Sequence, residues 1–307
     1  MNKTSENPGR VEKMFPTAPF NFRLMLQRPL SRPSELLQID ESANSLTRVL
    51  RVGDKAVPMT VVGLGTVDSP ELEIHLPTHL RDDERLACLS QVRFMFSVDR
   101  DLSDFVRTVS EDAAWQNLFL RYAGLRPTYD ANLFEAMVKV IIGQQLNVKF
   151  AATLVERLVH HSGEVVAWQG KQLHAFPTPG QVAACSYEDL RALSFSQRKA
   201  EYIIDFSRNV VTGKLDLEHL WQLSDDEVIA SLTKLRGIGR WTVECFMLFG
   251  MGRPDVLPAA DIGVQNALKV LYDMTERPRE AQLRDMAESW APWRSYATYY
   301  LWNSLIP

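Results

Sequence analysis

The sequence predicts an α+β N-terminal domain, an antiparallel sheet with one helix, followed by an all-α core. Strand-like segments separated by turn residues dominate the first hundred residues, whereas helical periodicity dominates from about Leu102 onward. A chain of 307 residues is long enough for two or three domains. We therefore predict an N-terminal domain over residues 1–100 and a helical domain over residues 101–307.

Short apolar segments with β-branched or alternating residues predict the strands of the N-terminal domain. These segments are 20–27, 46–52, 57–64 and 72–76. Turn residues at 53–54 and 68–70 separate them. A helix predicted over 82–94 would cover one face of the sheet. The residues themselves indicate no function for this domain.

A glycine-containing segment, Leu-Arg-Gly-Ile-Gly-Arg-Trp-Thr, links two helical patterns in the second domain. Ser224 and Glu227 predict the capped start of the first helix. Gly237 and Gly239 end that helix and permit positive φ and a close backbone approach. The second helix begins near Arg240, and its first N–H groups lack intrahelical partners. Such a helix end suits an anion, so the hairpin predicts contact with a DNA phosphate.

The charge of the hairpin segment supports contact with DNA, whereas the net charge of the whole chain opposes it. The formal net charge of the chain is −4, which disfavours DNA as a partner. The segment from Lys234 to Arg253 carries four cations and one carboxylate, which gives a local charge of +3. Local charge matters more than the total, so we expect modest DNA affinity, few phosphate contacts and a shallow salt dependence.

Asp261 lies at the predicted start of a third helix, after Pro258. Asp is among the best N-cap residues, and capping alone would explain its presence. The helix dipole would also keep this carboxylate ionised and aimed, as is needed beside a sugar that develops positive charge. The two interpretations are compatible, and they can be separated because Asn caps a helix as well as Asp but carries no charge.

Together these segments resemble the helix-hairpin-helix DNA glycosylase superfamily, and within it the alkylation-repair branch of the bacterial 3-methyladenine DNA glycosylase II type. Three motifs carry the resemblance: the hairpin at 235–242, Pro-Ala-Ala-Asp-Ile-Gly at 258–263, and Phe-Glu-Ala-Met-Val-Lys-Val-Ile-Ile-Gly-Gln-Gln at 134–145. Further matches lie at 176–179, 198–203 and 293–297. The resemblance covers about residues 120–307, whereas the first hundred residues match only loosely.

The resemblance implies a helical glycosylase core with two helical halves, a DNA and base cleft between them, and the hairpin at 233–242. It implies that Asp261 is the catalytic carboxylate and that Trp241 and Trp302 line the base pocket. An alternative for Trp302 is a place on the apolar face of a C-terminal helix. The resemblance also implies that a monovalent cation, Na⁺ or K⁺, binds backbone carbonyls of the hairpin. Those carbonyls belong to Thr233, Leu235 and Ile238, and no other cofactor is required.

Further residues are predicted to contact the DNA or the base. The hairpin would contact DNA through Arg236, Gly237, Gly239, Arg240 and Thr242. Gln145 continues the apolar stripe of Phe134, Val138 and Ile141, so we expect a buried amide that needs partners. A base edge, a phosphate or a backbone group would serve equally. Leu125 is the predicted wedge that fills the gap left by a flipped base.

The reaction type follows from residues that are absent. Superfamily members that cleave the strand carry a Lys nucleophile two residues after the second hairpin glycine, where this chain has Trp241. An iron–sulfur cluster needs four closely spaced cysteines, and this chain has only three, Cys88, Cys185 and Cys245, far apart. We therefore predict an N-glycosyl hydrolase that flips its target base, uses water as nucleophile, leaves an abasic site and lacks lyase activity.

Leaving-group chemistry favours alkylated purines as substrates. A carboxylate about 4 Å from an oxocarbenium ion contributes roughly 4 kcal/mol at an effective dielectric near 20. Enzymes typically lower the activation free energy by roughly 8–23 kcal/mol. One carboxylate is therefore best suited to cationic 3-methyladenine and 7-methylguanine, because these bases leave without an acid. Two alternatives remain: a glycosylase for deaminated bases such as hypoxanthine or uracil, and a non-catalytic helix-hairpin-helix DNA damage-binding protein in which Asp261 only caps.

The rest of the chain indicates its surroundings. It contains no apolar run long enough to span a membrane, and its N-terminus is polar, without a signal-peptide core. Three scattered cysteines fit a reducing cytoplasm. The six histidines show no metal-ligand spacing, and His160 and His161 are expected to be solvated. We expect a cytoplasmic, nucleoid-associated monomer whose partner is double-stranded DNA containing damaged bases.

Overall fold

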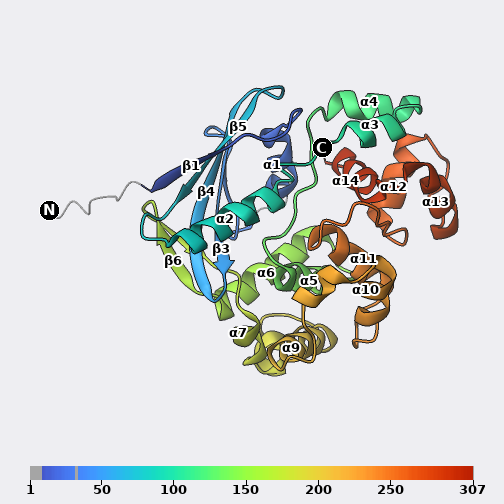
Figure 1. Ribbon diagram of the computed structural model, residues 1–307. Coiled ribbons are helices and arrows are strands. Elements are labelled where there is room, and N and C mark those ends of the chain that lie inside the picture. Colours follow the sequence, from blue (N-terminus) through green and yellow to red (C-terminus); the bar gives the residue numbers. More distant parts are fainter. Residues whose placement is uncertain (1–8, 32–33, 307) are drawn as a thin grey trace.

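The computed structural model describes residues 9–31 and 34–306, and it combines a five-stranded antiparallel sheet with a larger helical body (Figure 1). The sheet has the strand order β1-β5-β4-β3-β2. Its strands are β1 (Arg10–Met14), β2 (Gln38–Asp40), β3 (Ser45–Val52), β4 (Lys55–Gly65) and β5 (Pro70–Leu76). Helix α2 (Asp82–Met95) lies across the sheet (Figure 1).

Alternation along the strands places one face of the sheet in the core. In β5, Leu72, Ile74 and Leu76 are buried at every second position, as expected when successive side chains point to opposite faces. The registers pair Val61 with Ile74 and Val49 with Pro58. The strands predicted over 46–52, 57–64 and 72–76 and the helix predicted over 82–94 are thus confirmed.

The strand predicted over 20–27 is wrong, because this segment forms helix α1 (Phe22–Leu30). Asn21 caps the helix, accepting a hydrogen bond from the Leu24 N–H at 3.1 Å. Phe22, Met25 and Leu26 are buried, a spacing of three and four residues that forms one helical stripe. The apolar residues of this segment therefore follow the helical period of about 3.6 residues and not the alternation of a strand. The two edge strands, β1 and β2, were not predicted.

Helices form most of the remaining chain. They are α3 (Ser103–Val109), α4 (Ala113–Arg121), α5 (Leu133–Gly143), α6 (Val148–Ser162), α7 (Pro179–Ala183), α8 (Tyr187–Ala192), α9 (Gln197–Val211), α10 (Asp225–Leu232), α11 (Arg240–Phe249), α12 (Ile262–Leu271), α13 (Glu280–Met286) and α14 (Arg294–Ser304). Short 3₁₀ turns occur at η1 (Glu218–Gln222) and η2 (Ala287–Trp290). A small hairpin, β6 (Val165–Trp168) with β7 (Lys171–His174), interrupts the predicted all-α core.

Two large hydrophobic clusters do not follow the predicted domain boundary near residue 100. One contains the buried face of the sheet together with apolar residues of α1–α4 and of α12–α14. The other contains residues of α5–α11. Helix α11 contributes to both, through Leu248 to the first and Phe246 to the second. The C-terminal helices therefore share a hydrophobic cluster with the N-terminal sheet and α1–α4, and the boundary near residue 100 stays a prediction.

A buried ion pair fixes the sheet against helix α5. Arg48 of β3 donates to Glu135 of α5 at 2.8 Å, and both side chains are almost fully buried. Lys139, one turn further along α5, is 3.3 Å from the Glu135 carboxylate and also pairs with Asp130. Burial opposes the charge of Glu135, but the Arg48 and Lys139 cations outweigh it and lower the pKa of Glu135. The network holds the start of α5 in place.

A helix that crosses a membrane needs about 20 consecutive, mostly apolar residues. Within residues 9–31 and 34–306, no helix is long and apolar enough to cross a membrane.

Candidate active site

The hairpin lies between α10 and α11, and α10 begins with the predicted N-terminal capping box. Ser224 accepts a hydrogen bond from the Glu227 N–H, and the Glu227 carboxylate accepts one from the Ser224 N–H at 2.8 Å, which confirms the capping box. Gly237 has φ of 84°, and a Cβ built there would lie 2.2 Å from the Tyr202 ring. Glycine is therefore required at this position, both for its backbone conformation and for the contact with Tyr202.

Gly239 has a different role from Gly237. Its φ is −93°, so the prediction of positive φ is wrong here, and Gly239 is the N-cap residue of α11. A Cβ at this position would meet no atom within 4 Å. The first turn of α11 is therefore uncovered at Gly239, and a phosphate oxygen can approach its N–H groups.

Two side chains outside the hairpin hold it in place, and no local sequence pattern indicates either role. Gln144 donates to the Gly237 carbonyl and to the Thr242 hydroxyl, each at 2.9 Å. Lys199 donates to the carbonyls of Ile141, Ile142 and Gln144 at 2.7–2.9 Å and so closes the C-terminal end of α5. Because Thr242 is buried and already bonded, its hydroxyl supports the hairpin instead of facing DNA.

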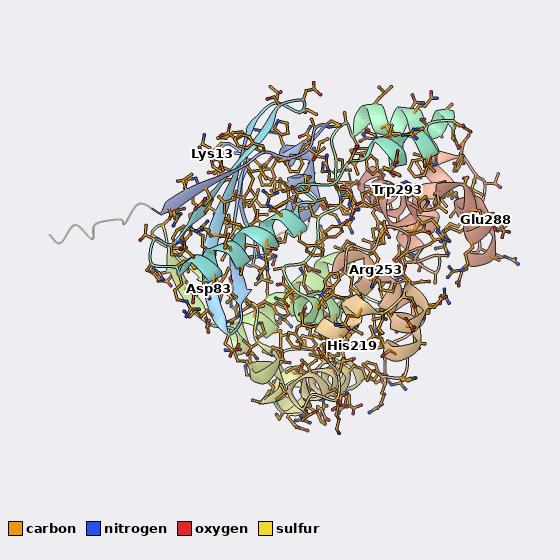
Figure 2. The ribbon with its side chains drawn as sticks, viewed as in Figure 1. Lys13, Asp83, His219, Arg253, Glu288 and Trp293 are labelled. Atoms are coloured by element: carbon orange, nitrogen blue, oxygen red, sulfur yellow. The ribbon has the colours of Figure 1, made fainter. Side chains whose placement is uncertain are left out.

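The cations of the hairpin region are mostly paired. Arg236 lies 2.6 Å from Glu201, and Arg240 lies 2.9 Å from the buried Glu244. Arg253, labelled in Figure 2, donates to the Leu223 carbonyl at 2.7 Å and also faces Asp225. The predicted local charge of +3 is therefore partly neutralised within the fold. Arg236 and Arg240 nevertheless keep more than half of their side-chain surface exposed.

Asp261 is held through both carboxylate oxygens. It is the N-cap of α12, and its Oδ1 accepts from the Val264 N–H at 3.0 Å, which confirms the predicted cap. Oδ1 also accepts from the indole N–H of Trp302 at 2.9 Å. Oδ2 accepts from the indole N–H of Trp241 at 3.1 Å. Three N–H donors from α11, α12 and α14 thus fix the orientation of one carboxylate.

Gly263 permits this close packing. A Cβ at Gly263 would lie 2.9 Å from Oδ1 of Asp261 and 3.1 Å from Nε1 of Trp302. Both distances are too short for an unstrained side chain, so the glycine of the 258–263 motif makes room for the Trp302–Asp261 hydrogen bond. Trp302 also stacks on Phe249 with ring centroids 5.3 Å apart. It is both part of the apolar face of α14 and a partner of Asp261.

A buried arginine from the N-terminal part completes the surroundings of Asp261. Arg28 of α1 is 7% exposed, and its Cζ lies 5.1 Å from the centroid of the Trp302 ring. The Phe249 and Tyr299 rings are each 5.4 Å from the same atom. Burial lowers the pKa of Arg28, whereas the nearby Asp261 carboxylate acts in the opposite direction. The sequence pattern does not indicate this role, because Arg28 follows directly after the segment 20–27 that is predicted as a strand.

Two predicted site residues are not where the sequence analysis placed them. Gln145 is exposed, because α5 ends at Gly143 and the helical stripe does not reach it, so the expected buried amide is wrong. Its φ is 56°, an unusual conformation for a residue other than glycine. Leu125 is fully buried, and its carbonyl accepts a hydrogen bond from Tyr300 at 2.8 Å. A side chain buried in the core cannot enter DNA, so the Leu125 wedge is wrong.

The predicted cation site lies in the turn between α10 and α11. The Leu235 carbonyl accepts a hydrogen bond from the Ile238 N–H at 3.1 Å, and a carbonyl oxygen can accept a second partner. Thr233 is the C-cap of α10, and its hydroxyl donates to the Ile229 carbonyl. Binding of Na⁺ or K⁺ to the carbonyls of Thr233, Leu235 and Ile238 stays a prediction.

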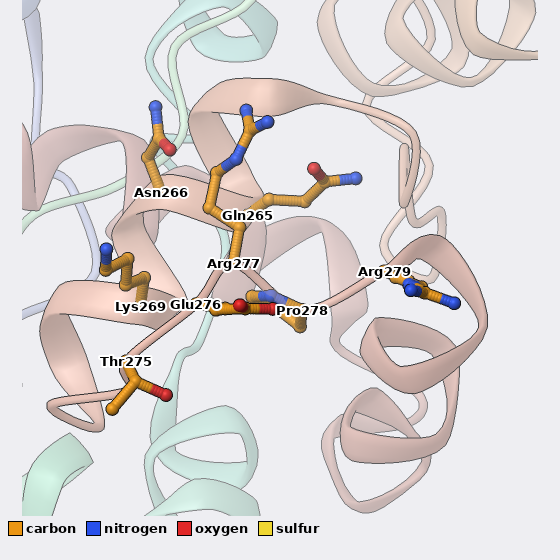
Figure 3. Close-up of a pocket in the computed structure, with 8 residues that line it drawn as sticks. All are labelled: Gln265, Asn266, Lys269, Thr275, Glu276, Arg277, Pro278 and Arg279. Carbon is orange, nitrogen blue, oxygen red and sulfur yellow. The ribbon is translucent and has the colours of Figure 1, made fainter.

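A polar surface pocket of about 560 Å³ lies beside α12, the helix that begins after Asp261 (Figure 3). Its lining includes the cations Lys269, Arg277 and Arg279 and the carboxylate of Glu276. Gln265, which also lines it, donates to the Ala259 carbonyl at 3.0 Å and so connects the pocket to the Asp261 loop. The pocket is basic and suits an anionic group.

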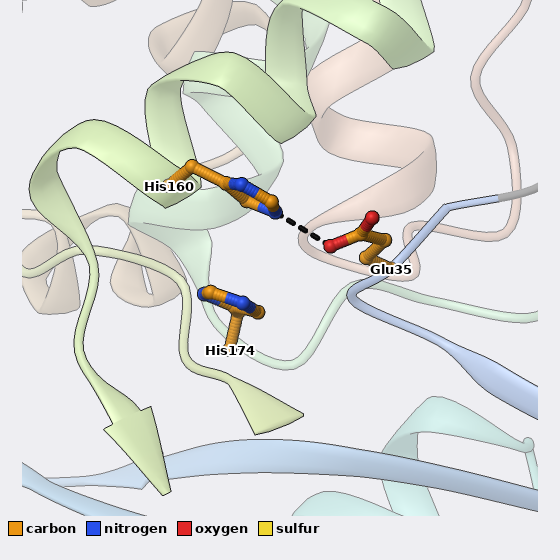
Figure 4. A group of neighbouring side chains, drawn as sticks. All are labelled: Glu35, His160 and His174. Carbon is orange, nitrogen blue, oxygen red and sulfur yellow. Dashed lines mark hydrogen bonds and ion pairs between the residues drawn. The ribbon is translucent and has the colours of Figure 1, made fainter. Parts of the chain in front are cut away.

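His160 and His174, which belong to different elements, lie close to Glu35 at the surface (Figure 4). His160 of α6 lies 2.6 Å from the Glu35 carboxylate. The His160 and His174 rings stack with centroids 4.2 Å apart. The expectation that His160 is simply solvated is therefore incomplete. These contacts connect the segment after α1 to α6 and β7.

The sequence of this chain is similar to those of base excision DNA repair proteins. A model of the HhH-GPD superfamily, described as base excision DNA repair proteins, matches residues 138–292. The YfjP protein of Bacillus subtilis, whose name assigns it provisionally to the DNA-3-methyladenine glycosylases, is 35% identical over 296 residues, covering 96% of this chain and 99% of YfjP.

Solved structures share the fold. A 3-methyladenine DNA glycosylase from Archaeoglobus fulgidus superposes with a TM-score of 0.85 at 23% identity, covering 96% of this chain and 98% of that chain. The Schizosaccharomyces pombe 3-methyladenine DNA glycosylase Mag1, solved with abasic DNA, gives a TM-score of 0.57 at 28% identity. In that comparison 96% of the Mag1 chain matches 66% of this one, so part of this chain has no counterpart there.

Proposed function

Because this chain belongs to the helix-hairpin-helix superfamily of base excision DNA repair proteins, we propose that it is a monofunctional DNA glycosylase for alkylated purines. It flips a base of the 3-methyladenine or 7-methylguanine type out of double-stranded DNA and hydrolyses its N-glycosidic bond. The product is an abasic site. The observation that carries the proposal is the single carboxylate of Asp261, held on both oxygens by Trp241, Trp302 and the Val264 N–H.

The hairpin supplies the contact with the DNA backbone. A phosphate oxygen binds the N–H groups at the start of α11, where Gly239 leaves space and the helix dipole favours negative charge. The exposed Arg236 and Arg240 add charge, and a phosphate can replace their carboxylate partners in part. A monovalent cation on the carbonyls of Thr233, Leu235 and Ile238 would add a positive charge beside the same phosphate. The basic pocket beside α12 suits a second phosphate.

Gln145 takes the role of the wedge. It is exposed directly after α5, and the neighbouring Gln144 is bonded to the Gly237 carbonyl of the hairpin. Its left-handed backbone conformation costs roughly 1–2 kcal/mol, a strain that persists where the surrounding structure fixes it and that is common at functional sites. An amide side chain in this position fills the space of the flipped nucleotide and can bond to the base left unpaired.

Asp261 stabilises the sugar during bond cleavage. As the C1′–N bond lengthens, positive charge develops on the sugar ring and is attracted by the carboxylate. Fixed donors keep the carboxylate oriented before the reaction, so little reorganisation is needed at the transition state. Water adds to C1′. Lyase activity is not expected, because Trp241 occupies the position of the nucleophilic Lys and its indole N–H is bonded to Asp261.

Base release from methylated duplex DNA tests the proposal. The wild-type chain is expected to release 3-methyladenine and 7-methylguanine, identified by chromatography. Asp261→Asn keeps Oδ1 as the capping acceptor for the Val264 N–H, but its amide nitrogen cannot accept from the Trp241 indole, so its DNA affinity should match the wild type and its melting temperature should fall slightly. Loss of a charge interaction of roughly 4 kcal/mol should slow release about 10³-fold. Intact DNA binding with no release by either protein would instead support a damage-binding protein.

A further inference from the structure

Two imidazole rings and one carboxylate come together at the surface from three separate elements. Glu35 lies shortly before β2, His160 is in the last turn of α6, and His174 is the last residue of β7 (Figure 4). One ligand atom of each residue lies within 4.8 Å of the ligand atoms of the other two. Imidazole nitrogens and carboxylate oxygens are common zinc ligands, and two histidines with one carboxylate are a known zinc ligand set. The histidines have no metal-ligand spacing in the sequence, so only the fold assembles this set.

The distances within this cluster suit a small metal ion. Three atoms within 4.8 Å of one another have a common centre about 2.8 Å or less from each, and zinc bonds to nitrogen and oxygen measure roughly 2.0–2.2 Å. Shifts of less than about 1 Å therefore bring all three atoms to bonding distance. The side chains of His160 and Glu35 are 46% and 60% exposed, which leaves them space to rotate. A metal ion would replace the proton that now lies between His160 Nε2 and the Glu35 carboxylate, 2.6 Å apart.

The backbone beneath these side chains is already held by other contacts. The Glu35 N–H donates to the Glu156 carboxylate of α6 at 3.1 Å, and the next residue, Leu36, is buried in the cluster formed by α5–α11. His174 pairs with Val165 across the hairpin of β6 and β7. Binding an ion therefore requires ordering of side chains and not of loops, which lowers its entropic cost. Glu156 also brings a second carboxylate near the two imidazoles, and a divalent cation would balance both negative charges.

We propose that Glu35, His160 and His174 form a zinc-binding site, with water completing the coordination of the ion. Both histidines bind through a deprotonated ring nitrogen and Glu35 binds through its carboxylate. An ion pair of Glu35 with His160 alone would need no second imidazole, and exposed ion pairs contribute little to stability. A zinc ion makes use of all three side chains. This inference does not rest on the proposed glycosylase function.

The ion would join the N-terminal part of the chain to the helical core. Glu35 and His160 are 125 positions apart, and Glu35 lies outside residues 138–292, the segment matched by the superfamily model. A metal that connects such distant residues closes a long loop and so restricts the unfolded chain. Because the three ligands come together only in the folded chain, binding of the ion favours folding. The expected role of the ion is therefore to stabilise the protein.

Titration of the full chain with Zn²⁺, after removal of metals with a chelator, tests the inference. Calorimetry should show one equivalent bound with a Kd in the micromolar range or lower. Zn²⁺ at about 100 times the Kd should raise the melting temperature by roughly 5 °C. Mg²⁺ at the same concentration should not, because it prefers oxygen ligands. His174→Ala is the decisive variant, because His174 takes no part in the Glu35–His160 ion pair. It should weaken Zn²⁺ binding about 100-fold or more, since loss of a residue that only supports a ligand already costs 10–100-fold.

His161→Ala is the matched control, because His161 is the next residue of α6, is exposed and lies outside the cluster. It should bind Zn²⁺ like the wild type. Zn²⁺ binding that His174→Ala leaves unchanged, or that His161→Ala weakens equally, would mean adventitious binding and would overturn the site. Absence of binding, or binding without a rise in melting temperature, would also overturn it. If His174→Ala melts lower without metal, the visible spectrum of Co²⁺ bound to the wild-type chain decides. Bands of a tetrahedral nitrogen and oxygen site would support the proposal, and the spectrum of hydrated Co²⁺ would overturn it.

Discussion

The hairpin and the proposed base pocket at Asp261 are joined by one helix, α11, yet they are built in opposite ways. The hairpin is contiguous in sequence, and its form follows from a capping box, two glycines and an uncovered helix start. The pocket combines side chains from α1, α11, α12 and α14. The proposed contact with the DNA backbone therefore resides in a local motif, whereas the proposed base site depends on how the whole chain packs. Substitutions should separate the two functions.

Gly237→Ala should damage the hairpin most. The added Cβ would overlap the Tyr202 ring, and φ of 84° is unfavourable for alanine. We expect a loss of about 3 kcal/mol in the free energy of unfolding and at least a tenfold weaker DNA affinity. Gly239→Ala is the matched control for stability, because its Cβ would meet no atom within 4 Å and its φ is negative. Its added Cβ would occupy the space proposed for the phosphate, so this variant should weaken DNA binding without destabilising the fold. Denaturant unfolding and a DNA binding isotherm measure the two effects. Equal losses in the free energy of unfolding would contradict the assigned role of Gly237.

Trp302→Phe should affect the pocket and leave the hairpin intact. Phenylalanine retains a ring beside Phe249 but removes the N–H that donates to Oδ1 of Asp261. Loss of one hydrogen bond to a charged group costs roughly 1.5–3 kcal/mol, so the single-turnover rate should fall about tenfold or more. DNA affinity should not change. A fall in affinity with an unchanged rate would reverse the assignment of the two regions.

Gln145→Ala should have the smallest effect. The side chain is exposed, and exposed substitutions rarely change stability by much, so the melting temperature should stay within about 2 °C of wild type. Loss of the wedge should lower the rate by roughly threefold to tenfold and reduce 2-aminopurine fluorescence when this base is placed opposite the lesion. Gln144→Ala is the informative contrast, because Gln144 bonds to the hairpin and its loss should weaken DNA binding instead. No change in rate or fluorescence for Gln145→Ala would exclude the wedge role.

The residues that are wrongly predicted and those that are not predicted have one cause in common, which is burial by distant parts of the chain. The segment 20–27 was assigned a strand because its apolar residues fit two periods, and only packing against the sheet selects the helix. Leu125 is predicted as the wedge because the resemblance places the family's wedge in the loop 125–129, yet its side chain is fully buried in the core. Gln145 was placed inside because the helix was extended past Gly143. Burial depends on distant residues, so local patterns do not report it.

By itself, the sequence determined the elements whose physics is local. A capping box, a glycine with positive φ at Gly237, an uncovered helix start and an Asp at an N-cap all depend on neighbouring residues, and all four are present. Tertiary structure decided what surrounds the carboxylate. The hydrogen bonds to Asp261 from Trp241 and Trp302 join residues 20 and 41 positions apart, and Arg28 arrives from another part of the fold. Such contacts form only when helices pack, because their energy comes from burial and alignment between elements and not from any one segment.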